Sequence, residues 1–239
     1  LFFLDGDTIV SPGSKRAASD AVASIITAID DVQKKEFKNV FCAVRPPGHH
    51  AEKNKAMGFC IFGNVAIGAK YALSHKSIRK VAILDFDVHH GNGTQNIFAG
   101  DDGLFFASSH QSALYPGTGA ERKVTANLVN VPLPAGTDGA AFRAAWEVDV
   151  LPALEAFAPE LILISAGFDG HARDPLAGWN LQAEDFAWVT GAIGEVAATV
   201  PAGGRIVSVL EGGYEAQGFC INKPFVAKGR GQAHNLVHP

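Results

Sequence analysis

The segment VAILDFDVHHGNGTQ, residues 81–95, joins an apolar run to side chains that can bind metal or transfer protons. Asp85, Asp87, His89 and His90 follow the apolar residues directly. A buried strand that ends in carboxylates and imidazoles holds charged groups still, as metal and catalytic sites require. The segment therefore indicates a metal-dependent hydrolase.

Three other apolar runs also end in polar side chains. In a parallel sheet covered by helices, ligands bind beyond the carboxyl ends of the strands. Four such ends in one chain would rarely arise from independent surface loops, so we expect one shared site. The additional residues are His49 and His50 after FCAV, Asp169 and Asp174 after LILIS, and Glu211 and Tyr214 after IVSVL.

Two carboxylates and one imidazole suit a borderline cation such as zinc, with a coordination position left open for water. We expect the ligands to be Asp87, His89 and Asp169. Asp87 and His89 are two residues apart, so in a continuous strand their side chains would share one face. The cation would offset the cost of burying the carboxylates.

The bound water needs a general base and the leaving group needs an acid. His49 and His50 can divide these tasks if their partners move their pKa values apart. Asp85 and Asn92 are the predicted partners, because a carboxylate favours a charged imidazole whereas an amide only orients one. Tyr214, on a Gly-Gly turn, can donate its hydroxyl to an oxyanion. The set predicts amide hydrolysis by metal-activated water.

The elements that must position these residues alternate between strand and helix, which predicts an α/β fold. Runs such as VAIL, LILIS and IVSVL are apolar at successive positions, so both faces of these strands should be covered. We expect a three-layer arrangement, with a mostly parallel sheet sandwiched by helices. The predicted strands are 40–44, 81–86, 104–108, 161–165 and 206–210, and the predicted helices are 64–73, 142–154, 186–198 and one capped by Ser14 with an apolar face of Ala18, Ala21, Val22, Ile25, Ile26, Ile29 and Val32.

Composition permits this interpretation and excludes others. The 239 residues are 47% hydrophobic, enough for one substantial core. A net charge of −4 without a basic stripe argues against direct binding to nucleic acid. No apolar run approaches the roughly 20 residues that span a bilayer. Three cysteines, two in apolar runs, predict reduced thiols and a cytoplasmic protein, or a nuclear one if the source is eukaryotic.

The two ends of the chain differ from its middle. The sequence begins abruptly with LFFLDGDTIV and has no starting Met, which fits the interior of a larger protein. Residues 215–239 show no helical period and mix Gly, Pro, Lys and Asn. We expect a catalytic domain over 1–214 that lacks its N-terminal part, followed by a divergent or disordered tail over 215–239.

Six motifs in order resemble the zinc-dependent histone deacetylase family, and most closely its class II and bacterial deacetylase-like branch, which is related to acetylpolyamine amidohydrolases. They are RPPGHH, GFC, DFDVHHGNGTQ, YPGTG, SAGFDGHARDPL and LEGGY, and the match covers residues 4–214. The resemblance implies an arginase/deacetylase-like fold and a zinc-dependent enzyme that removes acetyl or other acyl groups from lysine side chains. The implied substrate is an acetylated protein or a small acetylated amine.

Residue roles follow from the same resemblance. It places zinc on Asp87, His89 and Asp169, the catalytic pair on His49 and His50, and the tyrosine that stabilises the transition state on Tyr214. The walls of an acyl-lysine channel fall on Phe59 and Tyr115, with Leu176 at its rim. The resemblance also implies potassium near the zinc, at Asp85, Asp87, His89, Ser108 and Ser109, and at a second site near Phe98, Asp101, Leu104 and Asn127.

The chain departs from the family pattern at several points. Asn92 stands where some branches have Asp, Gly63 replaces a larger polar residue, and the N-terminal segment and closing helix of the family are missing. Two alternatives stay open: an acetylpolyamine amidohydrolase, and a catalytically silent fragment that binds acyl-lysine. An arginase-like enzyme would need a second set of metal carboxylates, which DFDVHHGNG does not offer.

Overall fold

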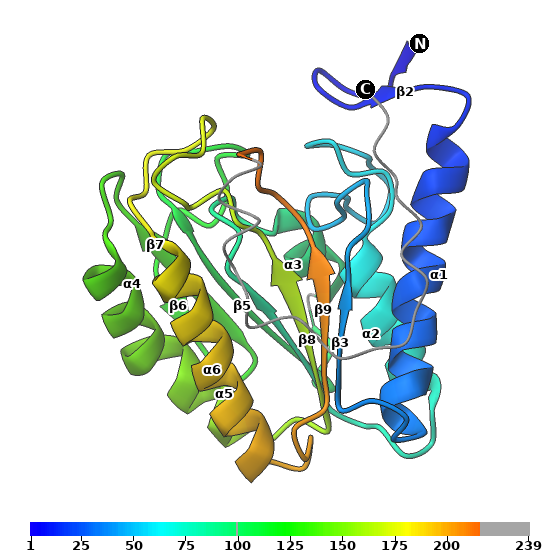
Figure 1. The fold of residues 1–239 in the computed structure, drawn as a ribbon, viewed down its shortest axis with the longest axis vertical. Coiled ribbons are helices and arrows are strands. Elements are labelled where there is room, and N and C mark those ends of the chain that lie inside the picture. Colours follow the sequence, from blue (N-terminus) through cyan, green and yellow to red (C-terminus); the bar gives the residue numbers. More distant parts are fainter. Residues whose placement is uncertain (99, 216–239) are drawn as a thin grey trace.

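The computed structural model describes residues 1–98 and 100–215, and this part of the chain forms three layers (Figure 1). A mostly parallel sheet is the middle layer, with helices on both faces, which confirms the predicted fold class. Within the described residues the sheet has seven strands, in the order β3-β9-β8-β4-β5-β7-β6. Their bounds are β3 Asn39–Cys42, β4 Val81–Asp85, β5 Leu104–Gln111, β6 Lys123–Val124, β7 Leu128–Leu133, β8 Leu161–Ala166 and β9 Ile206–Leu210.

The strands that precede the predicted site residues are neighbours in this sheet. β3, β9, β8 and β4 follow one another in the strand order, and each pair is parallel. Their carboxyl ends therefore lie along one edge. Asp85, the last residue of β4, is in register with Ser165 of β8 and with Ser108 of β5.

Two groups of helices cover the two faces of the sheet. α1 and α2 pack on one face together with α3, while the other carries α4, a π-helical turn, α5 and α6 (Figure 1). The bounds are α1 Ser14–Gln33, α2 Asn64–Ser74, α3 Asn92–Phe98, α4 Gly139–Ala145, the π turn Trp146–Val150, α5 Leu151–Phe157 and α6 Ala183–Thr199. A separate hairpin of β1 (Phe2–Phe3) and β2 (Ile9–Val10) lies above α1 in Figure 1.

Both faces of β4 and β8 are buried, which explains their unbroken apolar runs. Ala82 and Leu84 of β4 join the core beneath α4–α6, whereas Val81 and Ile83 join the core beneath α1 and α2. Side chains of a strand alternate between faces, so successive apolar residues serve two cores.

Helix α1 carries the predicted apolar face but begins differently. Gly13 is the N-cap and supplies no side-chain cap; Ser14 is the first helical residue, and its hydroxyl accepts a hydrogen bond from Ser11 N–H. The predicted Ser14 cap is therefore wrong. The buried face agrees with the prediction, except that Ala28 is also buried, and Val22 and Ile26 lie at its margin. Among the described residues no helix is both long and apolar enough to cross a membrane.

Other predicted bounds need correction. β3 ends at Cys42 rather than residue 44, because Val44 N–H turns back to the Cys42 carbonyl. The predicted helix 142–154 is divided by the π turn, just before Pro152, which has no N–H to continue the regular ladder. α6 begins earlier than predicted because Gln182 and Asp185 form a capping box.

Five elements of the described residues did not show in the sequence pattern: β1, β2, β6, β7 and α3. β7 contains Asn130 and Pro132, which interrupt its apolar run. α3 is seven residues long and contains no acidic cap signal. The chain after β4 thus forms a turn over residues 86–91 and then the short helix α3.

A pair of helical glycines tests how tightly α1 and α2 pack. A Cβ at Gly68 in α2 would lie 2.5 Å from Ile25 Cγ2 of α1, whereas a Cβ at Gly191 in α6 would have nothing within 4 Å. Alanine at either position gains about 1 kcal/mol of helix propensity. Crowding at Gly68 should cost about 1–3 kcal/mol. We expect urea denaturation to give Gly68→Ala a free energy of unfolding lower than that of Gly191→Ala by that amount. Equal values would contradict the tight contact.

Candidate active site

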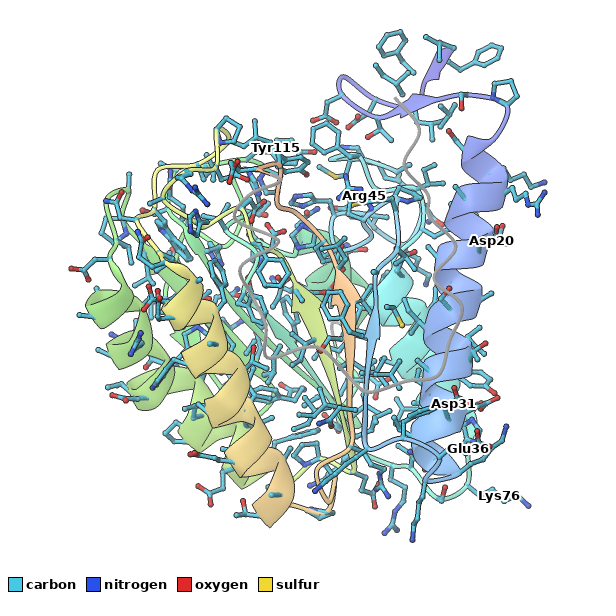
Figure 2. All side chains as sticks on the ribbon, in the orientation of Figure 1. Asp20, Asp31, Glu36, Arg45, Lys76 and Tyr115 are labelled. Carbon is cyan, nitrogen blue, oxygen red and sulfur yellow. The ribbon has the colours of Figure 1, made fainter. Side chains whose placement is uncertain are left out.

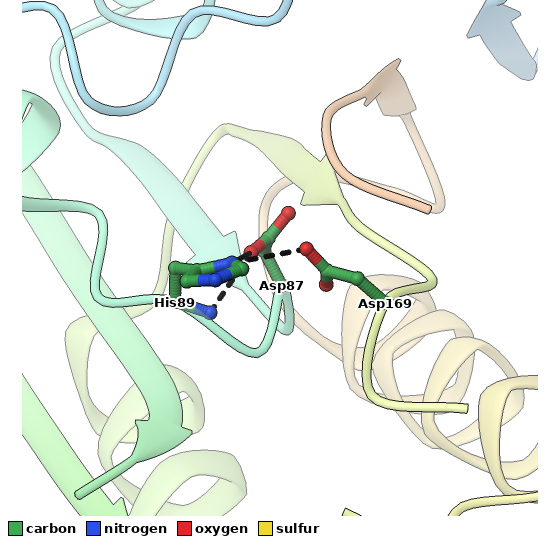
Figure 3. A group of neighbouring side chains, drawn as sticks. All are labelled: Asp87, His89 and Asp169. Atoms are coloured by element: carbon green, nitrogen blue, oxygen red, sulfur yellow. Dashed lines mark hydrogen bonds and ion pairs between the residues drawn. The ribbon is translucent and has the colours of Figure 1, made fainter. Parts of the chain in front are cut away.

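Three side chains that can bind a metal converge just beyond the ends of β4 and β8 (Figure 3). Asp87 and His89 lie in the turn after β4, and Asp169 lies in the loop after β8. Their potential ligand atoms are all within 4.8 Å of one another. His89 Nδ1 is 3.1 Å from Asp87 Oδ1 and 3.0 Å from Asp169 Oδ2. Because β4 ends at Asp85, the predicted shared face of a continuous strand is wrong: a turn, not a strand, brings Asp87 and His89 together.

Backbone N–H groups fix the carboxylates of this cluster. Asp87 accepts hydrogen bonds from His89 N–H at 2.9 Å and Gly212 N–H at 2.7 Å, and Asp169 accepts one from Val88 N–H at 3.0 Å. A Cβ at Gly212 would overlap the Asp169 carboxylate. The cluster is therefore built without space for an additional side chain.

Buried carboxylates this close together need positive charge between them. The pKa values of Asp169 and His89 are shifted in the direction that this need implies. Burial and the charge of Asp87 raise the pKa of Asp169 to about 6. Burial alone would lower the pKa of His89, but Asp169 and Asp87 raise it to about 10. Two oxygen donors and one nitrogen donor in such surroundings fit a divalent cation.

The tandem histidines lie beside this cluster and differ in their partners. His49 Nδ1 is 2.9 Å from Asp85 Oδ2, and His50 Nδ1 is 2.8 Å from Asn92 Oδ1, so the predicted pairs do meet. Burial opposes a charge on His49, yet Asp87 and Asp85 raise its pKa well above the ordinary value. Burial and the charge of His49 lower the pKa of His50 well below it. The surroundings thus move the pKa values of the two imidazoles in opposite directions.

Glu211 lies beneath the histidine turn and was not assigned a role from the sequence. It is fully buried; Oε2 accepts hydrogen bonds from Gly48 N–H at 2.6 Å and His49 N–H at 3.1 Å, while Oε1 accepts one from Ser165 Oγ. The carboxylate therefore fixes the backbone that presents the histidines. An acidic residue at the end of an apolar strand was the available signal.

A cavity of about 230 Å³ leads to the cluster. Phe59, Tyr115 and Leu176, the predicted channel residues, all line it and are 37–43% exposed, as expected at a mouth. Figure 2 shows Tyr115 above the sheet, on the side where the parallel strands end. The same cavity is lined by His49, His50, Asp87, His89, Asp169 and Tyr214 and by the unpredicted Asp7, Pro47, Gly58, Leu114 and Gly212.

Asp7 and its neighbour connect the N-terminal hairpin to the channel wall. Asp7 Oδ1 accepts a hydrogen bond from Gly58 N–H at 3.2 Å, and Thr8 Oγ1 accepts one from Phe59 N–H at 3.1 Å. These contacts hold Phe59 at the cavity. In the sequence, the acidic DGD segment indicated these contacts only weakly, because 51 residues separate the two members of each hydrogen-bonded pair.

Tyr214 is held from two sides. Asp174 Oδ2 accepts a hydrogen bond from Tyr214 N–H at 2.7 Å, and Oδ1 accepts one from Leu176 N–H at 3.0 Å. The Arg45 guanidinium carbon lies 5.7 Å from the centre of the Tyr214 ring, and Arg45 Nη1 donates to the Glu211 carbonyl. One carboxylate, Asp174, therefore connects the Tyr214 backbone to the channel rim at Leu176.

The residues predicted to bind potassium lie in two places. Asp85 is in register with Ser108, whose hydroxyl lies 3.0 Å from His110 Nδ1, and Ser109 Oγ accepts a hydrogen bond from Trp146 Nε1. At the second place, which the prediction assigned to Phe98, Asp101, Leu104 and Asn127, the Asp101 carboxylate pairs with Lys70 and the Asp101 carbonyl accepts from Asn127 Nδ2. Potassium binding stays a prediction at both places.

The predicted tail, 215–239, lies outside the described residues apart from Glu215.

Comparisons with known proteins agree with the geometry. The family model "Histone deacetylase domain" matches residues 2–222. The chain is 43% identical over 226 residues to "Type-2 histone deacetylase 2" of Dictyostelium discoideum, covering 87% of this chain and 13% of that protein. It is 41% identical to "Histone deacetylase-like amidohydrolase" of Pseudomonas aeruginosa, covering 88% of this chain and 57% of that protein. The chain thus spans only part of the length of either relative.

A solved structure shares the fold. The crystal structure of the HDA15 HD domain superposes with a TM-score of 0.84 at 35% identity, covering 92% of this chain and 65% of that one. The mostly parallel sheet between helices is therefore the arginase/deacetylase-like fold. Because the family model spans nearly all of the described residues, the chain belongs to the histone deacetylase family.

Proposed function

We propose that the protein is a zinc-dependent amidohydrolase that removes acetyl or other acyl groups from the side-chain nitrogen of lysine in proteins. The observation that carries this proposal is the convergence of a metal-ligand set, a histidine pair and a phenol around one narrow cavity. Each of these groups has a separate task in amide hydrolysis, and the membership in the deacetylase family supports the combination.

Asp87, His89 and Asp169 would hold the zinc, because two oxygens and one nitrogen form a ligand set that zinc accepts and leave a position open. A zinc ion bound there supplies a Lewis acid that polarises the substrate carbonyl and makes water a better nucleophile.

His50 is the proposed proton acceptor. Asn92 holds its Nδ1, and its pKa is lowered, so the imidazole is neutral and its other nitrogen can take the proton of the attacking water. The same proton can then pass to the leaving nitrogen. His49 lies between carboxylates, with Nδ1 2.9 Å from Asp85 and Nε2 3.8 Å from Asp87. Its charge, rather than its proton, is available to stabilise the developing negative charge.

Tyr214 is the proposed oxyanion donor. Burial and the charges of Asp87 and Asp169 raise its pKa, so the phenol keeps its proton. Asp174 and Arg45 hold the residue at the cavity, where a fixed donor stabilises negative charge as it forms on the substrate oxygen.

The cavity favours an uncharged substrate side chain over a charged one. The aromatic rings of Phe59 and Tyr115 form part of its lining, and an acylated lysine has lost the charge that would be costly to bury there. A second candidate, hydrolysis of small acetylated amines, is favoured by Asp7, whose carboxylate lines the cavity and would attract a cationic amine.

Substrate comparison tests the proposed function directly. We expect chelator-sensitive release of acetate from an acetyl-lysine peptide, with a higher kcat/KM than for acetylated putrescine. A preference for acetylated putrescine would favour the second candidate. Tight binding of the peptide without acetate release would instead indicate a catalytically silent binder and overturn the proposal.

Removing one proposed ligand tests the metal assignment. Asp169→Ala should abolish zinc retention, measured by elemental analysis of the dialysed protein, because only two ligands remain. Asp149→Ala is the matched control: Asp149 is also buried, but it pairs with Arg122, and that variant should keep its zinc. Stoichiometric zinc in Asp169→Ala would refute the assignment.

Removing one hydroxyl tests the phenol. Tyr214→Phe should keep zinc and lower kcat for the acetyl-lysine peptide by about 100-fold, the usual effect of losing one oxyanion donor. Tyr71→Phe provides the control, because the Tyr71 hydroxyl bonds to Asp30 on α1 and neither residue lines the cavity. Unchanged turnover in Tyr214→Phe would remove the phenol from the mechanism.

A further inference from the structure

Glu52, two residues after His50, contacts the catalytic histidine through one intermediate. The half-buried Glu52 accepts a hydrogen bond through Oε1 from Asn92 Nδ2 at 2.9 Å. The other end of the same amide, Asn92 Oδ1, lies 2.8 Å from His50 Nδ1. Glu52, Asn92 and His50 therefore form a continuous chain of hydrogen bonds, in which the mechanism described above uses only the last two.

An amide has two unlike ends, so its orientation decides what it offers to His50. With Oδ1 toward the imidazole, Asn92 accepts from Nδ1–H, and His50 Nε2 keeps a free lone pair. The reversed amide would present N–H to Nδ1, which would move the ring proton to Nε2. A neutral His50 with its proton on Nε2 cannot accept another proton there.

Glu52 supplies the contact that distinguishes the two orientations. A carboxylate only accepts hydrogen bonds, so it attracts the NH₂ end of Asn92 and would repel the oxygen of a reversed amide. Two further acceptors near Asn92 Nδ2, the His50 carbonyl and Met57 Sδ, both lie 3.5 Å away. Glu52 therefore makes the stronger contact.

Backbone hydrogen bonds fix the positions of Glu52 and Asn92 in this series of hydrogen bonds. Glu52 N–H donates to the Lys55 carbonyl at 2.9 Å. Asn92 begins α3, whose next residue, Gly93, donates its N–H to the His49 carbonyl at 3.0 Å. A Cβ at Gly93 would lie 2.6 Å from the carbonyl carbon of His50, so α3 approaches the histidine turn as closely as a glycine permits.

We propose that Glu52 is a positioning residue that orients the Asn92 amide and thereby keeps the neutral His50 protonated on Nδ1, with Nε2 free to accept a proton. Its consequence for turnover rests on the proposed function. Glu52 and Asn92 also line a separate cavity of about 690 Å³. Water from that cavity can replace a removed carboxylate without setting the direction of the amide, so Glu52→Ala should loosen the orientation rather than unfold the protein.

Kinetics of paired variants provide the first test. Glu52→Ala should lower kcat for the acetyl-lysine peptide by about 10-fold, the lower end of the usual effect of losing a supporting hydrogen bond, with KM unchanged. Glu52→Gln should restore only part of it, because the glutamine oxygen can still accept from Asn92 whereas its NH₂ end can also donate to a reversed amide. Glu195→Ala, an exposed glutamate on α6, is the control and should be unaffected.

The Asn92→Asp background separates positioning from general damage. A carboxylate has two equivalent acceptor oxygens and needs no orienting, and Glu52 would repel it, so Glu52→Ala should not lower kcat in that background. An equal loss of kcat in the unmodified protein and in the Asn92→Asp background would overturn the proposal, as would full activity of Glu52→Ala alone.

A spectroscopic test does not depend on turnover. Nitrogen-15 NMR of labelled histidine distinguishes Nδ1–H from Nε2–H, and His50→Gln identifies the His50 signals. We expect His50 to be Nδ1–H in the unmodified protein and to gain Nε2–H in Glu52→Ala. An unchanged tautomer would overturn the proposal. Absence of deacetylase activity together with the expected tautomer shift would instead contradict the proposed function and leave the role of Glu52 intact.

Discussion

Buried negative charge at one edge of the sheet is the constraint on which the rest of the structure depends. Asp85, Asp87, Asp169 and Glu211 are each at most 1% exposed, and all lie at or just beyond the ends of three adjacent strands. An uncompensated charge in such a place costs several kcal/mol, on the order of the whole stability of a domain. The compensation comes from imidazoles, from backbone N–H groups and, in the proposed function, from zinc.

The need to compensate this buried charge determines which residues the nearby backbone can carry. Gly212 donates its N–H to Asp87, and a Cβ there would overlap the Asp169 carboxylate. Gly91 and Gly167 are similarly close to Asp85 and Asp87. One glycine in each of the DFDVHHGNG, SAGFDG and LEGGY motifs is thus required by the approach of a carboxylate to the chain, in addition to any need for flexible turns.

The parts of the site that could be predicted are the polar residues that follow buried strands of the sheet. Apolar runs mark strands buried on both faces, and the residues that follow them must meet at one edge of a parallel sheet, so the ligand set and the His49–Asp85 contact were accessible. Asp7 and Glu52 were missed because neither directly follows a strand of the main sheet, and their contacts with Gly58 and Asn92 depend on how the loops pack. The shared strand face expected for Asp87 and His89 was wrong, because β4 ends at Asp85, one residue before the predicted end, and the turn that follows brings the two side chains together.

The positions of the site residues along the chain have a consequence for assembly. The proposed ligands Asp87 and Asp169 are 82 positions apart, and each follows a different strand of one parallel sheet. An intermediate in which β4 and β8 have not yet paired would hold neither the ligand geometry nor affinity for the ion. Metal affinity would then be thermodynamically linked to global folding, and an ion at 100 times its dissociation constant would add about 2.7 kcal/mol to the native state.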